Sequence, residues 1–288
     1  MLFILNRIAG GRSSESYRKS IESIVSRIPG SSLALTDYAG HAREIASAAV
    51  KDGCDLVVAV GGDGTVNEIA SVLVGTDVAL GIVPIGSGNG LARHLGIPLD
   101  LEGAVKAILE RHVVTIDYAT INGKPFFCTT GIGFDALVAN DYAKAGTRGL
   151  ITYVKEAIND WFSYAPGEYV IETDNRTIRT KALLITVGNA NQWGNDYFIT
   201  PHASLKDGKL DIAIVKPANI LSYLKMVWQL RHKTLAENPD VVYLKSPFVK
   251  ITCLSESNVA AHYDGEATSF NGNIVIDCKK ESLRVVSS

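Results

Sequence analysis

The amino-acid sequence predicts an N-terminal parallel α/β domain followed by an all-β domain. A continuous apolar run, Leu56–Val60, has the length and composition of a buried parallel strand, and a glycine turn and an amphipathic helical pattern follow it. A second apolar run, Val78–Pro84, also leads into a glycine-rich turn. Beyond Val113 the pattern changes to short strands separated by polar turns, which indicates an antiparallel sandwich or barrel-like domain.

Strands and helices alternate in the first part of the chain. The expected strands are Leu2–Leu5, Ser32–Leu35, Leu56–Val60 and Val78–Pro84, and the expected helices are Tyr17–Ile28, His41–Lys51, Val66–Leu73 and Leu101–Arg111. Within the first of these helices, Ile21, Ile24 and Val25 fall on one face. Alternation of this kind predicts a parallel sheet that helices cover on both faces.

The second part of the chain is dominated by short strands. They are expected at Val113–Ile121, Lys124–Thr130, Tyr169–Glu172, Ile178–Thr186, Leu210–Val215, Val241–Lys245, Val249–Leu254, Ile274–Cys278 and Leu283–Val286. Asn122-Gly123 is a strong hairpin signal, and Asn271-Gly272 marks another turn. Two helical stretches, Leu150–Phe162 and Ile220–Lys233, carry aromatic and basic residues that can dock on a lipid surface, although core packing is their commoner fate.

Composition and charge narrow the class of protein. The chain has 288 residues, enough for two domains with their own cores, and 47% of them are hydrophobic. The 28 basic and 30 acidic residues give a formal net charge of -2, so nucleic acid is not an expected partner. No apolar run is long enough to span a membrane, and the apolar N-terminus is expected to be a first strand rather than a signal peptide. The 4 cysteines lack CxxC spacing, which indicates free thiols in a reducing cytoplasm.

The turn after the first apolar run has the features of an anion site. Gly61, Gly62 and Gly64 leave backbone amides open to a ligand, and Thr65 is the expected N-cap of the following helix. Unpaired amides and the helix dipole both favour phosphate at such a place. Asp63 stands inside the turn, where a carboxylate suits a metal ion or a polar group of a ligand. On these residues alone, a tight strand-to-helix turn without a ligand is the alternative.

A second glycine turn, with Gly86, Gly88 and Gly90, follows the second apolar run. Parallel strands place both turns at the same carboxyl edge of a sheet, where ligands bind. There is no Walker A sequence, so these turns would have to hold any phosphates. The segment Gly131–Ala136 satisfies the G-x-G-x-x-A dinucleotide pattern, but no parallel unit surrounds it, and we do not expect NAD to bind there.

The segment GGDGTVNE, Gly61–Glu68, resembles the nucleotide-binding signature of the diacylglycerol kinase catalytic-domain family of lipid kinases, which includes sphingosine and ceramide kinases and bacterial soluble lipid kinases. Its GGDGT core is shared with 6-phosphofructokinases and NAD kinases. Four later segments also resemble the lipid kinases, in the expected order: Ile85–Pro98, Gly131–Ala136, His202–Asp211 and Ala261–Ala267. The resemblance implies a three-layer α/β nucleotide-binding domain over residues 1–113, an antiparallel β-sandwich with the lipid and metal sites over 114–288, and an active site in the cleft between these domains.

The resemblance also implies roles for individual residues. The implied ATP-binding residues are Asn6, Arg7, Ile8, Ala9, Gly10, Thr36, Gly61, Gly62, Asp63, Gly64, Thr65, Val66, Asn67, Ser87 and Asn89. The family usually has NPxSG at the first turn, so Arg7 and Ala9 depart from its pattern. Mg²⁺ is expected on Asp207 and the carbonyls of Ser204 and Lys209, although an Asp-Gly pair before a strand is usually a turn. Glu266 is the expected catalytic base, with Asp264 as its nearest rival, and Asp63 would orient Mg²⁺ or the triphosphate.

The implied function is an ATP-dependent lipid kinase that transfers the γ-phosphate of ATP to a hydroxyl of diacylglycerol, a sphingoid base or a related lipid alcohol. An NAD kinase-like enzyme and a catalytically inactive nucleotide- or lipid-binding module are the alternatives. The expected location is the cytoplasm, with the lipid substrate met at the inner face of the membrane. Peripheral membrane contact and a homodimer are further expectations, and the sequence leaves the lipid acceptor open.

Overall fold

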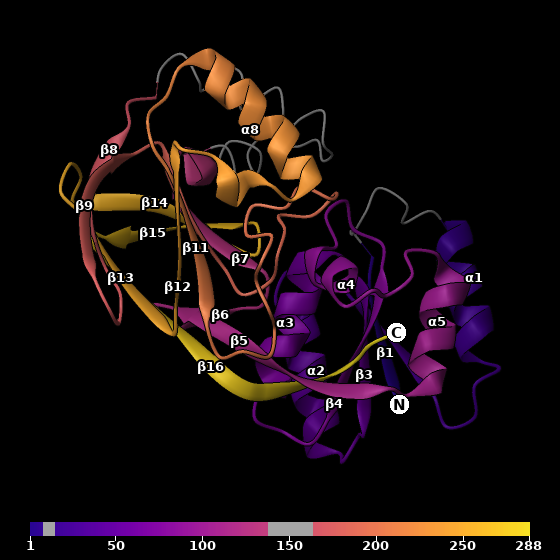
Figure 1. The fold of residues 1–288 in the computed structure, drawn as a ribbon. Helices are drawn as coiled ribbons and strands as arrows, with labels where there is room; N and C mark the ends of the chain where they lie inside the picture. The colour runs from indigo at the N-terminus through magenta and orange to yellow at the C-terminus, as the bar shows by residue number, and fades with distance from the viewer. Residues whose placement is uncertain (8–14, 138–163) are drawn as a thin grey trace. The chain divides into compact units, whose positions relative to one another are not determined.

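A computed structural model describes residues 1–7, 15–137 and 164–288 of the chain. Contacts divide these residues into unit 1, Met1–Ile116 with Glu281–Ser288, and unit 2, Asp117–Lys280 (Figure 1). Strands β5 (Val113–Ile121) and β16 (Asn273–Val286) each contribute residues to both units. The domain boundary expected at residue 113 stays a prediction.

Unit 1 is built on a parallel sheet. Its strands are β1 (Leu2–Asn6), β2 (Ser32–Thr36), β3 (Leu56–Gly61) and β4 (Ala79–Pro84), in the order β2-β1-β3-β4. The end of β16 continues this order and pairs with β4 in parallel, Val285 opposite Leu80. Every residue of β3 and β4 is buried, as the apolar runs predicted.

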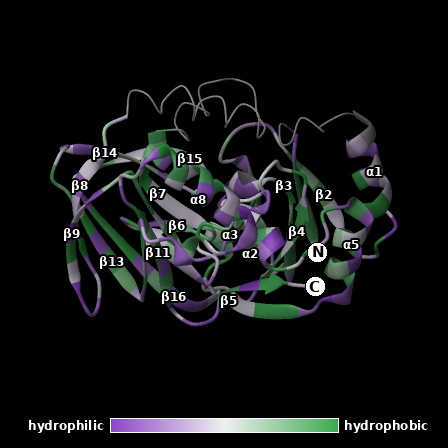
Figure 2. Ribbon diagram, turned by 45° about the horizontal axis from the view of Figure 1, so that its top comes forward, coloured by the Kyte–Doolittle hydropathy of each residue, from purple (hydrophilic) through white to green (hydrophobic). Residues whose placement is uncertain are grey.

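Helices cover both faces of this sheet. They are α1 (Glu15–Val25), α2 (His41–Lys51), α3 (Asp63–Leu73), α4 (Gly90–His94) and α5 (Leu101–Glu110). Figures 1 and 2 show α2 and α3 on one side of β3 and β4 and α1 and α5 on the other. Ile21, Ile69 and Ile108 bury their side chains in this three-layer core. Asp100 caps α5 by accepting a hydrogen bond from the Gly103 amide at 2.8 Å.

Unit 2 is an antiparallel β-sandwich. One sheet contains β5, β6 (Lys124–Phe126), β8 (Gly167–Glu172), β9 (Thr177–Ala182), β13 (Phe248–Cys253) and the start of β16. The other contains β7 (Thr129–Gly133), β10 (Leu184–Gly188), β11 (Leu210–Val215), β12 (Val241–Ser246), β14 (Asn258–Tyr263) and β15 (Glu266–Asn271), in the order β12-β11-β10-β7-β14-β15. Ile251 and Ile276 of the first sheet and Ile185 and Ile212 of the second belong to one apolar core. In Figure 2, β13 is mostly hydrophobic, whereas other strands of the sandwich mix hydrophobic and hydrophilic residues.

The predicted hairpin at Asn122-Gly123 is confirmed: both residues have positive φ, 45° and 82°, and β5 pairs with β6 in antiparallel. The single strand expected over Ile178–Thr186 is wrong. The segment contains two strands, β9 and β10, which lie in different sheets. The chain passes from one sheet to the other at Leu183, whose amide bonds to the Val215 carbonyl at 2.7 Å.

Helix α8 (Ile220–His232) lies within the stretch expected to be helical, and a short 3₁₀ turn, η1 (Leu235–Glu237), follows it. The other expected helix, Leu150–Phe162, lies outside the described residues. In the part of the chain that the structure describes, no helix is both long enough and apolar enough to cross a bilayer. The 4 cysteines are free thiols.

Candidate active site

The predicted nucleotide residues of unit 1 gather at the carboxyl edge of its parallel sheet. Asn6 ends β1, Thr36 ends β2 and Gly61 ends β3. The side-chain amide of Asn6 donates to the Thr65 hydroxyl at 2.9 Å, which ties the end of β1 to the start of α3. Strand ends that are distant in sequence therefore meet at one edge, where ligands bind in open α/β sheets. Three further predicted residues of the first turn, Ile8, Ala9 and Gly10, lie outside the described residues.

Two glycine turns touch each other at this edge. A Cβ atom added to Gly86 would lie 2.5 Å from the Cα atom of Gly62, and one added to Gly62 would lie 3.1 Å from the Cα atom of Gly86. Both distances are to backbone, which cannot move aside as a flexible side chain would. Only glycine therefore allows the turn after β3 and the turn after β4 to approach this closely.

Asp63 fastens the second turn to the first. Its Oδ2 accepts a hydrogen bond from the Asn89 amide at 2.8 Å, and its Oδ1 accepts one from the Gly90 amide at 2.7 Å. Asn89 in turn uses its side chain to bond both the amide and the carbonyl of Gly86, at 3.0 and 2.8 Å. Burial raises the pKa of the Asp63 carboxyl, against the lowering effect of the two amide donors. Both carboxylate oxygens thus hold backbone in place.

The expected N-cap, Thr65, is wrong: α3 begins at Asp63, so Gly62 is the N-cap and Thr65 lies inside the first turn. Gly62 brings no side chain over the helix end, and Thr65, Val66 and Asn67 are buried. The first amides of a helix have no partner within the helix, and the dipole favours an anion beside them. Of the other predicted residues, Ser87 is exposed, and Arg7 is exposed and paired with Asp37 at 3.1 Å.

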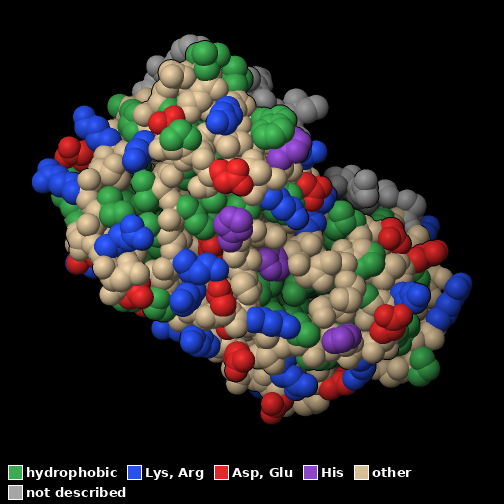
Figure 3. All heavy atoms as spheres, viewed as in Figure 1, with side chains coloured by type: hydrophobic (Ala, Val, Ile, Leu, Met, Phe, Trp, Pro, Cys, Tyr) green, Lys and Arg blue, Asp and Glu red, His purple; other side chains and the backbone are tan. Residues whose placement is uncertain are grey.

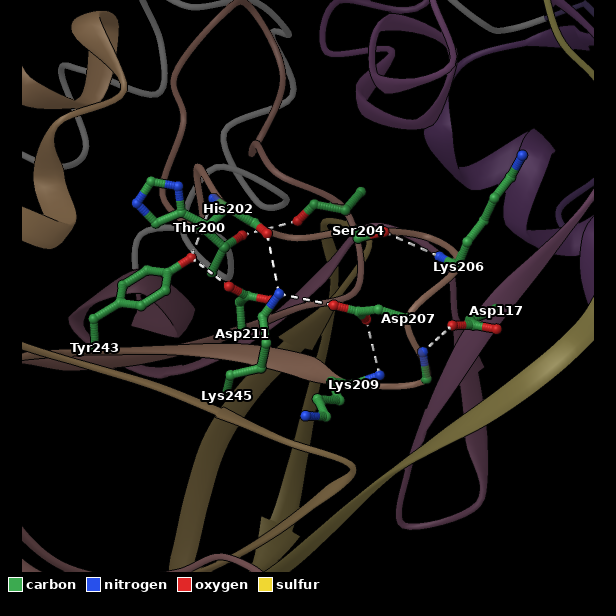
Figure 4. A network of polar contacts seen from close by, with 12 residues as sticks. Asp117, Thr200, His202, Ser204, Lys206, Asp207, Lys209, Asp211, Tyr243 and Lys245 are labelled. Carbon is green, nitrogen blue, oxygen red and sulfur yellow. Dashed lines mark hydrogen bonds and ion pairs between the residues drawn. The ribbon is translucent and has the colours of Figure 1, made fainter.

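The predicted Mg²⁺ ligands Ser204, Asp207 and Lys209 lie in the loop before β11 of unit 2 (Figure 4). The Asp207 Oδ1 accepts a hydrogen bond from the Lys209 amide at 3.0 Å, and its Oδ2 lies 2.8 Å from the Lys245 ammonium. Each carboxylate oxygen already faces a donor, and the Lys245 ammonium brings a positive charge to the carboxylate that is expected to hold the cation. This donor set does not fit a resident Mg²⁺.

Asp264 and Glu266, the rival carboxylates for the role of base, have different surroundings. Asp264 is buried in the turn between β14 and β15, and its carboxylate accepts hydrogen bonds from the amides of Phe127, Cys128 and Thr129 at 2.8, 2.8 and 3.2 Å. It thereby anchors this turn to the segment between β6 and β7. Glu266 begins β15 with an exposed side chain, and among the described residues nothing pairs with it. Of the two, Glu266 has the carboxylate that is free to accept a proton.

The segment Gly131–Ala136 has a packing role in unit 2. Strand β7 pairs in antiparallel with β10 and β14, so no dinucleotide-binding unit surrounds it. The Asp135 carboxylate lies 2.9 Å from the buried His262 ring and also accepts the Thr186 hydroxyl at 3.0 Å. Burial acts to lower the pKa of His262, but the Asp135 charge outweighs it and the pKa is raised.

Sequence reasoning missed two polar residues near the Asp207 loop. Asp117 on β5 is 1% exposed and accepts a hydrogen bond from the Gly208 amide at 2.6 Å. Lys245 on β12 contacts Asp207, as described above. Each is the single charged residue of its strand. A lone charge in an otherwise uncharged strand was the sequence signal that could have identified these two residues.

Comparison with known proteins agrees with this architecture. Residues 1–121 match the family described as the diacylglycerol kinase catalytic domain, and residues 129–287 match the YegS C-terminal NAD kinase beta sandwich-like domain. The chain is 30% identical over 236 residues to the diacylglycerol kinase of Bacillus subtilis, covering 80% of this chain and 77% of that protein. It is 30% identical over 240 residues to a protein of Cronobacter sakazakii named "Probable lipid kinase YegS-like", with the same two coverages. It is 29% identical over 241 residues to an uncharacterized protein of Synechocystis. That match covers 81% of this chain but only 55% of the Synechocystis protein.

Solved structures show the same fold. A crystal structure of a diacylglycerol kinase from Bacillus anthracis superposes with a TM-score of 0.75 at 22% identity, covering 100% of this chain and 96% of that one. Another from the same bacterium gives a TM-score of 0.81 with the same identity and coverage. With both family matches in chain order and relatives at 30% identity over most of their length, this chain belongs to the diacylglycerol kinase catalytic-domain family of lipid kinases.

Proposed function

We propose that the protein is an ATP-dependent lipid kinase that transfers the γ-phosphate of ATP to the hydroxyl of a lipid alcohol. The observation that supports this best is the close approach of Gly62 and Gly86, which sets two glycine turns together at the carboxyl edge of the unit 1 sheet. Backbone amides beside a helix N-terminus suit a triphosphate. Membership of the lipid kinase family makes ATP the expected nucleotide.

In this proposal the chain positions the reactants and stabilises charge. Phosphoryl transfer passes through a loose, highly charged transition state, so fixed amides near the phosphates lower its energy. Asp63 acts by holding Asn89 and Gly90 in place. Mg²⁺ bound with ATP would neutralise phosphate charge. Glu266 would accept the proton that the attacking lipid hydroxyl loses, a role that its exposed and unpaired carboxylate allows.

We further propose that α8 contacts the lipid phase at the cytoplasmic face of a membrane. Leu221, Leu224 and Trp228 are 73%, 60% and 57% exposed on this helix, and hydrophobic side chains gather over it in the upper part of Figure 3. The helix has no acidic residue, and Arg231 and His232 form a basic end. Exposed apolar side chains beside basic ones suit an anionic lipid surface.

Purified protein incubated with γ-labelled ATP, Mg²⁺ and separate acceptors tests the main proposal. The acceptors are diacylglycerol, sphingosine and monoacylglycerol in mixed micelles, with NAD included because residues 129–287 match a domain described as NAD kinase-like. We expect label in a lipid and none in NAD. Label in NAD alone would favour the NAD kinase-like alternative, and no transfer to any acceptor would favour an inactive binding module.

A further inference from the structure

We propose that Lys245 is a built-in cation of unit 2, and that its ammonium occupies the carboxylate, Asp207, on which the family resemblance leads one to expect Mg²⁺. The proposal concerns how the His202–Lys209 loop is held, and it is independent of the proposed kinase activity. It starts from the misfit between the predicted metal ligands and their surroundings (Figure 4).

Three oxygen atoms surround the Lys245 ammonium. Its Nζ lies 2.8 Å from Asp207 Oδ2, 3.2 Å from Asp211 Oδ2 and 3.2 Å from the His202 carbonyl oxygen. Two of its N–H donors make hydrogen bonds, to Asp207 Oδ2 and to the His202 carbonyl, whereas Asp211 Oδ2 forms an ion pair with the ammonium and has no hydrogen-bond partner among the described residues. Carboxylates and carbonyls are also the ligands of hard divalent cations, which bind them at about 2.0–2.6 Å. The ammonium therefore uses the kind of donor set that a divalent ion would use.

Asp211 makes a positive charge necessary at this place. The residue is fully buried, and its Oδ1 accepts the Tyr243 hydroxyl at 2.7 Å. Its Oδ2 forms an ion pair with the Lys245 ammonium at 3.2 Å. A buried carboxylate without a compensating charge is strongly destabilising. Lys245 compensates Asp211 and, at the same time, holds Asp207 of the loop.

The sheet fixes where this ammonium lies. Asp211 on β11 and Lys245 on β12 are directly opposite each other in the antiparallel register. The charge is thus delivered from a rigid strand to the end of the loop. The amide of Gly208 in the same loop donates to Asp117, so β5 holds the loop at a second point.

Metal binding without nucleotide tests the proposal. Tb³⁺ luminescence is a suitable probe because Tyr243 lies beside the site and can sensitise a bound lanthanide, and Mg²⁺ and Ca²⁺ are then used as competitors. The proteins are wild type, Asp207→Asn, Lys245→Met, the Lys245→Met/Asp207→Asn double variant, and Lys250→Met. Lys250 is a matched control because it pairs with one carboxylate, Glu172 at 2.9 Å, on the same unit.

We expect no saturable competition by Mg²⁺ or Ca²⁺ in wild type or in Lys250→Met. Removing the ammonium in Lys245→Met should open one Ca²⁺ site with a Kd of about 10⁻⁴–10⁻³ M, the range of weak protein sites, and Asp207→Asn should abolish it. Chelator should leave the wild-type melting temperature unchanged.

One Mg²⁺ bound by the wild type without nucleotide and lost in Asp207→Asn would overturn the proposal. A folded Lys245→Met variant that gains no site would overturn it as well, because Lys245 would then be an ordinary ion-pair partner. If Lys245→Met does not fold, Lys245→Gln takes its place. In that case the comparison of Mg²⁺ binding by the wild type and by Asp207→Asn still decides whether the proposal holds. Kinase activity enters none of these readouts, so failure of the proposed function leaves the result unaffected.

Discussion

The Asp63 carboxylate accepts a hydrogen bond from the Asn89 amide at 2.8 Å, across 26 residues of sequence. This bond and its companion to Gly90 make one rigid structure of two glycine turns. An acidic residue in a glycine-rich turn therefore does not have to touch the ligand to matter. It can act by fixing the shape of the turns that would hold the ligand.

We expect Asp63→Asn to lower turnover and raise the KM for ATP together. The variant keeps one acceptor oxygen and loses the other, so one turn amide is left without its partner. A hydrogen bond to a charged group contributes about 1.5–3 kcal/mol, which corresponds to about 10–100-fold in the ratio kcat/KM. Steady-state kinetics measure this, with the exposed Asp52→Asn as control. Kinetics equal to wild type would remove Asp63 from the function.

Glu266→Gln should reduce turnover by about 10²–10⁴-fold with ATP affinity nearly unchanged, because the amide keeps the shape and loses the basicity. Asp264→Asn should cost less in turnover and more in stability, about 1–3 kcal/mol, because its carboxylate holds three buried amides. Kinetics and urea unfolding of both variants separate the two roles. An inactive Asp264→Asn beside a fully active Glu266→Gln would assign the base to the wrong carboxylate.

The stabilising effect of the His262–Asp135 pair should depend on pH. In the folded protein the pKa of His262 is raised above the ordinary 6.5. The contribution of the pair to the free energy of unfolding is therefore fully present below pH 6.5 and is lost as the pH rises through the folded pKa. Urea unfolding of wild type and His262→Asn across pH 6 to 9 measures it. The advantage of the wild type should be largest at the acid end, and a constant difference across the range would contradict the assignment.

Leu224→Glu should weaken binding to anionic vesicles. Burying a leucine side chain in lipid contributes about 1.5–3 kcal/mol, so its loss should reduce the partition coefficient about tenfold or more. Co-sedimentation with phosphatidylglycerol vesicles measures this. Leu109→Glu is the matched control, since Leu109 is a leucine 49% exposed on α5 of unit 1. Equal loss in both variants, or none in either, would argue against α8 as the lipid contact.

The fold class could be predicted because its signals are local. The apolar run Leu56–Val60 has a composition typical of a strand covered on both faces, and it forms most of β3. Asn122-Gly123 needs positive φ at both residues, which a two-residue hairpin supplies. Gly61–Glu68 identified the family by similarity, and the family matches agree.

The chemical surroundings of the candidate site residues could not be predicted in this way. Alternation along the chain puts Asp264 and Glu266 on the same face, yet one is buried against amides more than 130 residues away and the other is exposed. Strands β14 and β15 lack a marked alternation of apolar residues, so their hairpin was not anticipated. The sequence around an acidic turn residue is similar whether its carboxylate contacts water, a metal ion or backbone amides.

The sequence by itself determined the class of each domain, the glycine turns and the family, because strand composition, turn conformation and motif spacing are properties of short segments. Only the tertiary structure decided which partner each charged group has. Lys245 meets Asp207, 38 residues earlier in the chain, because the pairing of β11 with β12 brings its ammonium there. Such a contact depends on strand register and on packing between distant segments, and neither is encoded in the residues adjacent to either partner.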